Sequence, residues 1–152
     1  MKMIRVHAIG EFSNGNIHDV AHIRLYNPLR ILENSYEISL STGNDYKNHK
    51  DNDVFFIERT WCDAISIEEI VMFINFIKET NRRLIYEIDD NLLDIPTIKS
   101  QQKNAIRIMA KNADAVIVST EELKKRMSHF NSNIIVIPNF LSLKNIEQRK
   151  NI

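Results

Sequence analysis

The chain has 152 residues, of which 43% are hydrophobic and 26% are charged. These fractions are typical of soluble globular proteins, so they exclude a disordered chain and a fibrous repeat, and the length predicts one ordinary domain. Lys plus Arg equals Asp plus Glu at 20 each, so the net charge creates no field that would attract nucleic acid over a distance.

Six short apolar runs predict β-strands covered on both faces, because several carry β-branched residues at consecutive positions rather than alternating ones. In chain order the runs cover residues 3–9, 36–40, 54–57, 84–88, 115–118 and 134–137. Residues 41–53 separate the second run from the third. They are mostly polar and predict an exposed loop rather than a helix.

Helical patterns occupy most of the other gaps. Asn27 followed by Pro28 predicts the N-cap and first residue of a short helix that ends near residue 34. Ser66 and Glu69 form a capping box, which predicts a helix that runs to about residue 78.

Two more helices are predicted in the second half of the chain. The apolar spacing over residues 97–112 predicts one helix, and Ser119 with Glu122 predicts a capping box directly after the fifth strand. Strand and helix therefore alternate. This order predicts an α/β fold, a Rossmann-like three-layer sandwich with a mostly parallel sheet of about six strands.

In open α/β sheets, ligands bind outside the carboxyl ends of the strands. Asp89 and Asp90 end the fourth predicted strand, where a carboxylate can act as a base or bind sugar hydroxyls or a metal. Successive strand residues point in opposite directions, so we expect only one to face the crevice. The alternative is that one carboxylate caps the following turn while the other is solvated.

The loops after the first and third strands contain further candidates. Arg59 could bind a phosphate and Trp61 could stack on a ligand, although Trp61 could equally cover the core beside the next helix. Gly10 and Gly15 could let the backbone approach a ligand, or they could belong to a plain flexible loop. Their spacing matches neither the dinucleotide fingerprint nor a P-loop.

Basic residues recur at every fourth position on the helix predicted over residues 97–112. Such a stripe could meet anionic lipid headgroups or an acceptor phosphate, and the commoner alternative is a solvated outer face. The five histidines show no metal-ligand spacing, so no metal site is predicted. The stripe consists of Lys99, Lys103, Arg107 and Lys111.

Three segments, residues 86–96, 112–123 and 134–139, together resemble bacterial glycosyltransferases built from two Rossmann-like domains, the GT-B architecture. The resemblance implies that residues 1–141 form the N-terminal, acceptor-binding domain and that residues 142–152 lead towards a donor-binding domain. The chain ends about where that second domain would begin. We therefore expect the acceptor-binding half of a glycosyltransferase for cell-surface or protein glycans, inactive by itself.

The resemblance implies catalytic groups at Asp89 and Asp90 and an arginine, Arg24, ahead of the first helix. One departure from the family pattern is that Gly10 and Gly15 replace a glycine pair after the first strand. With the residues that follow the strands, the expected substrate-binding set is Gly10, Arg24, Glu58, Arg59, Trp61, Asn91, Ser119, Thr120 and Asn139.

The same resemblance implies no cofactor in this domain and a nucleotide sugar as the co-substrate of the complete enzyme. The expected partners are a glycan, lipid-linked or protein acceptor and the donor-binding domain, with no nucleic acid. Two alternatives stay open, a non-catalytic interaction module and a flavodoxin-like signalling domain. The single Cys62 and the lack of any signal-like or membrane-spanning apolar run predict a cytoplasmic protein, with peripheral membrane contact left open.

Overall fold

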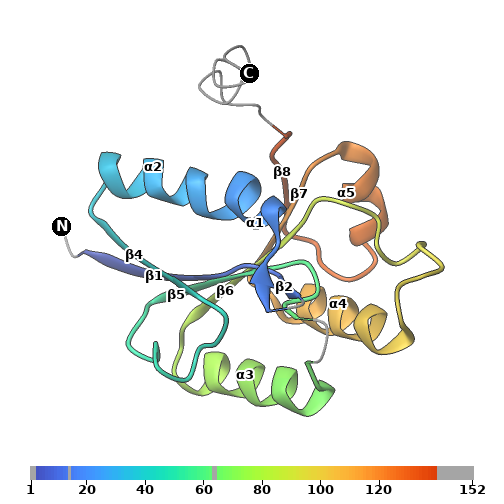
Figure 1. The fold of residues 1–152 in the computed structure, drawn as a ribbon, viewed down its shortest axis with the longest axis horizontal. Helices are drawn as coiled ribbons and strands as arrows, with labels where there is room; N and C mark the ends of the chain where they lie inside the picture. The colour runs from blue at the N-terminus through green and yellow to red at the C-terminus, as the bar shows by residue number, and fades with distance from the viewer. Residues whose placement is uncertain (1–2, 14, 63–64, 140–152) are drawn as a thin grey trace.

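The structure, a computed structural model, describes residues 3–13, 15–62 and 65–139. Six strands form one sheet in the order β4-β1-β5-β6-β7-β8, and every neighbouring pair is parallel (Figure 1). The strands are β1 (Ile4–Ile9), β4 (Ile38–Gly43), β5 (Val54–Glu58), β6 (Arg83–Ile88), β7 (Ala115–Val118) and β8 (Ile134–Val136). A small antiparallel hairpin, β2 (Phe12–Ser13) with β3 (Asn16–Ile17), follows β1.

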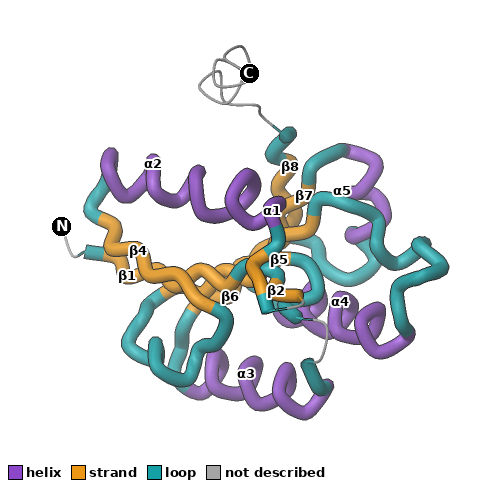
Figure 2. Tube along the Cα trace, viewed as in Figure 1, coloured by secondary structure: helices purple, strands orange, loops and turns teal. Residues whose placement is uncertain are grey.

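Helices lie on both faces of the sheet, so the predicted three-layer α/β fold is confirmed (Figure 2). One face carries a continuous helical stretch, and the other carries the three helices that connect β5 through β8. The continuous stretch comprises α1 (Asp19–Ala21), the π-helical segment η1 (His22–Tyr26) and α2 (Asn27–Ser35). The opposite face carries α3 (Ile67–Glu79), α4 (Ser100–Asn112) and α5 (Glu121–Met127).

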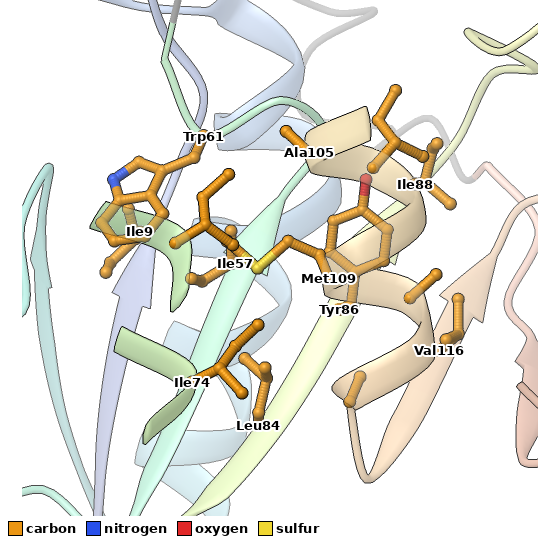
Figure 3. Close-up of a cluster of buried hydrophobic side chains, with 14 of the residues drawn as sticks. Ile9, Ile57, Trp61, Ile74, Leu84, Tyr86, Ile88, Ala105, Met109 and Val116 are labelled. Atoms are coloured by element: carbon orange, nitrogen blue, oxygen red, sulfur yellow. The ribbon is translucent and has the colours of Figure 1, made fainter. Parts of the chain in front are cut away.

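The larger core lies between the sheet and α3, α4 and α5. Alternate residues of β6, namely Leu84, Tyr86 and Ile88, are fully buried there, because successive strand residues point to opposite faces. Figure 3 shows side chains from the strands, α3 and α4 gathered in this cluster, with Met109 of α4 beside Tyr86. This packing holds the ends of the strands in fixed positions.

The face towards α2 is only partly covered. Leu25, Tyr26 and Leu29 bury Val6 and Ala8 of β1, and half-buried residues of β4 and β5 pack around them. Farther along the same face, Ile117 and Ile137 line a cavity together with Leu29 and Leu32 of α2, and Ile135 of β8 is 48% exposed. The sheet therefore keeps an apolar strip open to solvent beside α2.

The helix predicted over residues 27–34 is observed as α2, with Pro28 in its first turn. Its predicted N-cap is wrong, because the helical stretch already begins after His18, whose Nδ1 accepts from the Val20 N–H at 3.3 Å. Asn27 is not an N-cap, and its N–H donates to the His22 carbonyl five residues earlier. A proline inside an α-helix clashes with the carbonyl four residues before it. The wider π-helical turn accommodates Pro28, so the helix continues through it.

Other predicted boundaries shift by a few residues. Thr120, not Ser119, caps α5, because its side chain accepts from the Leu123 N–H at 3.1 Å. The predicted loop over 41–53 begins later, since residues up to Gly43 pair with β1, and Tyr46 within it is buried. The helix predicted from residue 97 starts at Ser100.

The predicted tail over residues 142–152 lies outside the described residues. Among the described residues, no helix has both the length and the apolar character needed to cross a membrane.

The order in which strands are added to the sheet reverses at β1. From β1 the chain crosses to β4 on one side, and after residues 44–53, which form no helix, it continues with β5 on the other side. A crevice is expected where the strand order reverses, outside the carboxyl ends of β1 and β5. The fold thus directs attention to the residues that follow Ile9 and Glu58.

Gly10 permits the close approach of η1 to the end of β1. A Cβ at Gly10 would lie 2.6 Å from Ala21 Cβ and 2.7 Å from the Tyr26 hydroxyl, whereas at Gly43 the nearest atom would be 3.4 Å away. We expect Gly10→Ala to lower the free energy of unfolding by about 1–3 kcal/mol because of overpacking. Gly43→Ala, the matched control, should change it by less than about 1 kcal/mol. Urea unfolding of both variants measures the difference, and equal effects would contradict the packing role of Gly10.

Candidate functional site

The carboxyl edge of the sheet, where the parallel strands end, brings together polar residues from several loops. Arg59, just after β5, lies at its centre. Its Nη1 is 3.0 Å from Asp89 Oδ1 and 3.1 Å from Asp90 Oδ2, and its Nε is 2.8 Å from Glu11 Oε2. We call Glu11, Arg59, Asp89 and Asp90 the Arg59 cluster. Both aspartates reach the same nitrogen, but their exposure differs, since the Asp89 side chain is 9% exposed and the Asp90 side chain 60%.

The loops after β1 and β5 are joined to each other at this point. The Glu11 N–H donates to Glu58 Oε2 at 2.9 Å, and the Thr60 hydroxyl donates to Glu11 Oε1. The Phe12 N–H donates to the Trp61 carbonyl at 2.8 Å. These contacts close the reversal point of the sheet around the carboxylate of Glu11, which is buried.

The backbone after β5 is strained. Arg59 has φ 51° and Trp61 has φ 65°, in a region that large side chains usually avoid and that is enriched at functional sites. Two hydrogen bonds hold Arg59 in place: its N–H donates to the Glu87 carbonyl at 2.8 Å, and its carbonyl accepts from the Tyr86 hydroxyl at 2.7 Å. This conformation directs the guanidinium towards Glu11, Asp89 and Asp90.

Two buried glutamates lie directly beneath the Arg59 cluster on the face towards α2. Glu58 and Glu87 are 0% and 1% exposed, and they are direct neighbours in the pairing of β5 with β6. Burial raises the pKa of Glu58 to about 8 and that of Glu87 to about 7. Within the described part of the chain, Glu58 Oε1 and Glu87 Oε2 have no hydrogen-bond partner. At neutral pH an ordinary glutamate is ionised, whereas carboxyl groups with pKa values raised in this way are expected to keep part of their protons.

Arg24, in η1, joins the buried glutamates to the segment after β8. Its Nε donates to Glu87 Oε1 at 2.7 Å, and its Nη1 donates to the Ile137 carbonyl at 2.8 Å and to Asn139 Oδ1 at 2.9 Å. The attraction of Arg24 opposes the effect of burial on the pKa of Glu87. Arg24 thus connects the helical layer to the sheet, which differs from the free substrate-binding arginine expected from the resemblance.

Two other predicted site residues have structural contacts. Trp61 is 4% exposed and packs in the core against Phe73, with its Nε1 donating to the Asn44 carbonyl, so it presents no stacking face at the surface (Figure 3). The core alternative for Trp61 is the one observed. Gly10 serves the packing of Tyr26, whose hydroxyl accepts from the Gly10 N–H at 2.9 Å.

The remaining predicted residues lie at the carboxyl edge. The Ser119 hydroxyl donates to the Asp89 carbonyl at 2.5 Å, and the Asn91 amide donates to Asp94 Oδ2 at 2.7 Å. The predicted grouping at one edge is therefore confirmed. Of the predicted site residues at this edge, those exposed to solvent are Asp90, Asn91, Thr120 and Asn139.

The charge balance of the Arg59 cluster limits what it can bind. Three carboxylates surround one guanidinium, so the cluster has an excess of negative charge and an added phosphate would be repelled. The phosphate-binding role considered for Arg59 is therefore disfavoured. Carboxylates accept hydrogen bonds from hydroxyl groups, so the cluster suits a neutral, hydroxyl-rich ligand. No group of three or more possible metal ligands occurs among the described residues.

The basic stripe on α4 makes few contacts with the rest of the structure. Lys99, Arg107 and Lys111 are exposed, and Arg107 donates to Asn104 on the same helix. This arrangement agrees with a solvated outer face.

Glu11 and Glu87 belong to the site but were absent from the predicted set. Glu87 interrupts a largely apolar strand and is itself buried, and a charge at such a position requires a partner or a shifted pKa. That interruption was a usable signal in the sequence. Glu11 had no comparable signal, because its importance depends on the loop after β5 folding against it.

Models of known protein families give no match to this chain, and a comparison with curated proteins gives none either.

The buried Glu58 predicts a specific pH dependence of stability. Its pKa rises from 4.5 to about 8 on folding, so its protonation stabilises the folded state fully below the lower value and this contribution is lost as the pH rises through the higher one. Glu58→Gln keeps an acceptor for the Glu11 N–H without the titration. We expect the variant to lose less stability than the wild type between about pH 5 and about pH 9.

Urea unfolding across that pH range measures the effect, and Glu79→Gln on the exposed side of α3 is the control. Part of the decline should remain in Glu58→Gln because Glu87 also titrates high. Parallel curves for Glu58→Gln and the wild type would show that Glu58 is ionised in the folded protein.

Proposed function

We propose that this chain binds the acceptor of a nucleotide-sugar-dependent glycosyltransferase, as the N-terminal domain of a GT-B enzyme. The observation that carries the proposal is the convergence of Glu11, Asp89 and Asp90 on Arg59 at the reversal point of a parallel sheet. That point is where α/β sheets bind their ligands. The resemblance of residues 86–96, 112–123 and 134–139 to this family supports the same function.

A sugar or other polyol suits this edge for a physical reason. Asp90 has 60% of its side chain exposed while one of its oxygens binds Arg59, so its other oxygen is available to accept from an acceptor hydroxyl. The Asp89 side chain is only 9% exposed and supports the position of Arg59. In the proposed complete enzyme, Asp90 is the better placed of the two aspartates to take the proton of the attacking hydroxyl.

The donor is assigned to a second domain in this proposal. The sequence contains neither a P-loop nor a dinucleotide fingerprint, and the Arg59 cluster repels phosphate, so the nucleotide diphosphate is expected to bind elsewhere. The acceptor hydroxyl and the sugar would then meet between the two domains, in a cytoplasmic enzyme that synthesises cell-surface or protein glycans. Positioning of both reactants can lower such a barrier by about 7–11 kcal/mol.

One observation favours the alternative of a non-catalytic interaction module. Apolar side chains beside α2, among them Ile135 of β8 and Ile137, are 48% and 43% exposed, and such a surface fits a macromolecular partner. The flavodoxin-like alternative has the same strand order, in which the strand that follows β1 in the main sheet, β4, lies at the sheet edge beside β1. Binding of saccharides at the carboxyl edge separates the proposed function from both alternatives.

The proposal predicts that saccharides bind at Asp90. A panel of methyl glycosides and short oligosaccharides, titrated into ¹⁵N-labelled protein, should shift the amide signals of Arg59, Asp90 and Ser119. Asp90→Asn should weaken the strongest binder about tenfold or more, because a hydrogen bond to a charged group contributes about 1.5–3 kcal/mol. Asp51→Asn, in the exposed loop between β4 and β5, is the control and should leave the affinity unchanged. Shifts confined to other surfaces would contradict the proposal.

A further inference from the structure

An apolar groove lies between α2 and the open face of the sheet. It encloses about 510 Å³, a volume within the range of about 300–1,000 Å³ typical of small-molecule sites. Its helical wall includes Ile23, Leu29 and Leu32, and its sheet wall includes Phe56, Ile117 and Ile137. We call this cavity the α2 groove.

The walls of the α2 groove remain accessible in the described structure. Ile23, Leu32 and Ile137 are 45%, 39% and 43% exposed, although the strands of a parallel sheet are normally covered on both faces. Exposed apolar groups that converge on one concave surface indicate a binding site more often than isolated ones do. The groove therefore presents a concave apolar surface to a ligand.

One end of the α2 groove is polar. Arg24 and Glu87 both line it, and Glu87 Oε2 has no hydrogen-bond partner within the described part of the chain although Glu87 is 1% exposed. Glu87 is paired with Glu58, which binds the Glu11 N–H of the Arg59 cluster. The polar end thus meets the carboxyl edge, while the rest of the groove runs along α2 between isoleucine and leucine side chains.

We propose that the α2 groove binds the apolar chain of a neutral amphiphile whose hydroxylated head lies at the carboxyl edge. This inference rests on the proposed function, and it assigns the acceptor to the lipid-linked class. The chain would lie between α2 and the open strands, with Ile137 and Pro138 at its passage to the edge. The head would meet the exposed oxygens of Asp90.

Two features favour an amphiphile over an apolar helix of another protein. A helix needs a uniformly apolar surface, whereas one end of this groove is lined by the charged residues Arg24 and Glu87, which suits an occupant with a hydrogen-bonding group at that end. The excess of carboxylates around Arg59 also disfavours an anionic head. Both features fit a ligand that is apolar along most of its length and hydroxylated at one end.

The test uses two probes with the same head, n-octyl β-D-glucopyranoside below its micellar concentration and methyl β-D-glucopyranoside. Isoleucine methyl NMR suits the site, because Ile23, Ile31, Ile117 and Ile137 all line the groove. The octyl compound should shift these methyl signals and bind at least about tenfold more tightly than the methyl compound, since each buried methylene adds to the affinity. The methyl compound should leave the groove signals unchanged.

Ile137→Asn and Ile135→Asn form a matched pair of variants. Ile137 follows β8 directly and Ile135 lies within it. They are exposed to a similar degree, 43% and 48%, but only Ile137 lines the groove. Ile137→Asn should remove most of the preference for the octyl chain, and Ile135→Asn should retain it. Far-UV circular dichroism of both variants checks that the fold is unchanged.

Three results would overturn the inference. The first is equal affinity for the two probes, and the second is a response to the octyl compound that Ile137→Asn leaves intact. The third is that no probe shifts the groove signals, while light scattering shows a dimer that Ile137→Asn dissociates. The outcome for the proposed function is read separately, from the amide signals of Arg59 and Asp90. If 1-decanol and the octyl compound move the groove signals equally and neither glucoside moves those amides, the groove binds apolar chains and the acceptor proposal fails.

Discussion

The guanidinium of Arg59 joins the loops that follow three neighbouring strands of the sheet. It binds Glu11 after β1 and both Asp89 and Asp90 after β6, while its own backbone follows β5. Without this cation, three carboxylates would repel one another at the edge of a low-dielectric sheet. The positive φ of Arg59 is maintained because β6 holds its backbone on both sides through Tyr86 and Glu87.

The buried glutamates connect this edge to the helical layer. Glu58 contacts the loop after β1, and Glu87 contacts Arg24 of η1, which in turn reaches Asn139 after β8. Burying two carboxyl groups side by side is unfavourable unless at least one is protonated. A site built in this way is expected to depend on pH near neutrality, and Glu87 of this pair also lines the polar end of the α2 groove. Glu87 therefore links the carboxyl edge of the sheet to the α2 groove.

Much of the fold follows from local patterns in the sequence. The runs at 54–57, 84–88 and 115–118 are strands, and the capping box at Ser66 starts α3, because such signals act over a few residues. The start of the first helix could not be obtained in this way. Pro28 looks like the start of a helix, and only the packing of Leu25 and Tyr26 on β1 extends the helical stretch back to Asp19.

The sequence predicted where the site lies, but it predicted the roles of the individual side chains less well. The rule that parallel strands end at one edge correctly grouped Glu58, Arg59, Asp89 and Ser119 there. The rule gives no information about which side chains pair with each other. Arg59 is engaged by carboxylates and Trp61 is turned into the core by a strained backbone, and both outcomes depend on contacts between distant segments.

The central claim is that the carboxylates around Arg59 bind the hydroxyl groups of an acceptor. The most direct measurement is a crystal structure of the chain with the saccharide that binds it best. The account predicts a sugar hydroxyl within hydrogen-bond distance of Asp90, with Arg59 still bound to Asp89 and Glu11. A saccharide bound away from the carboxyl edge, or an anion that displaces Glu11 from Arg59, would contradict it.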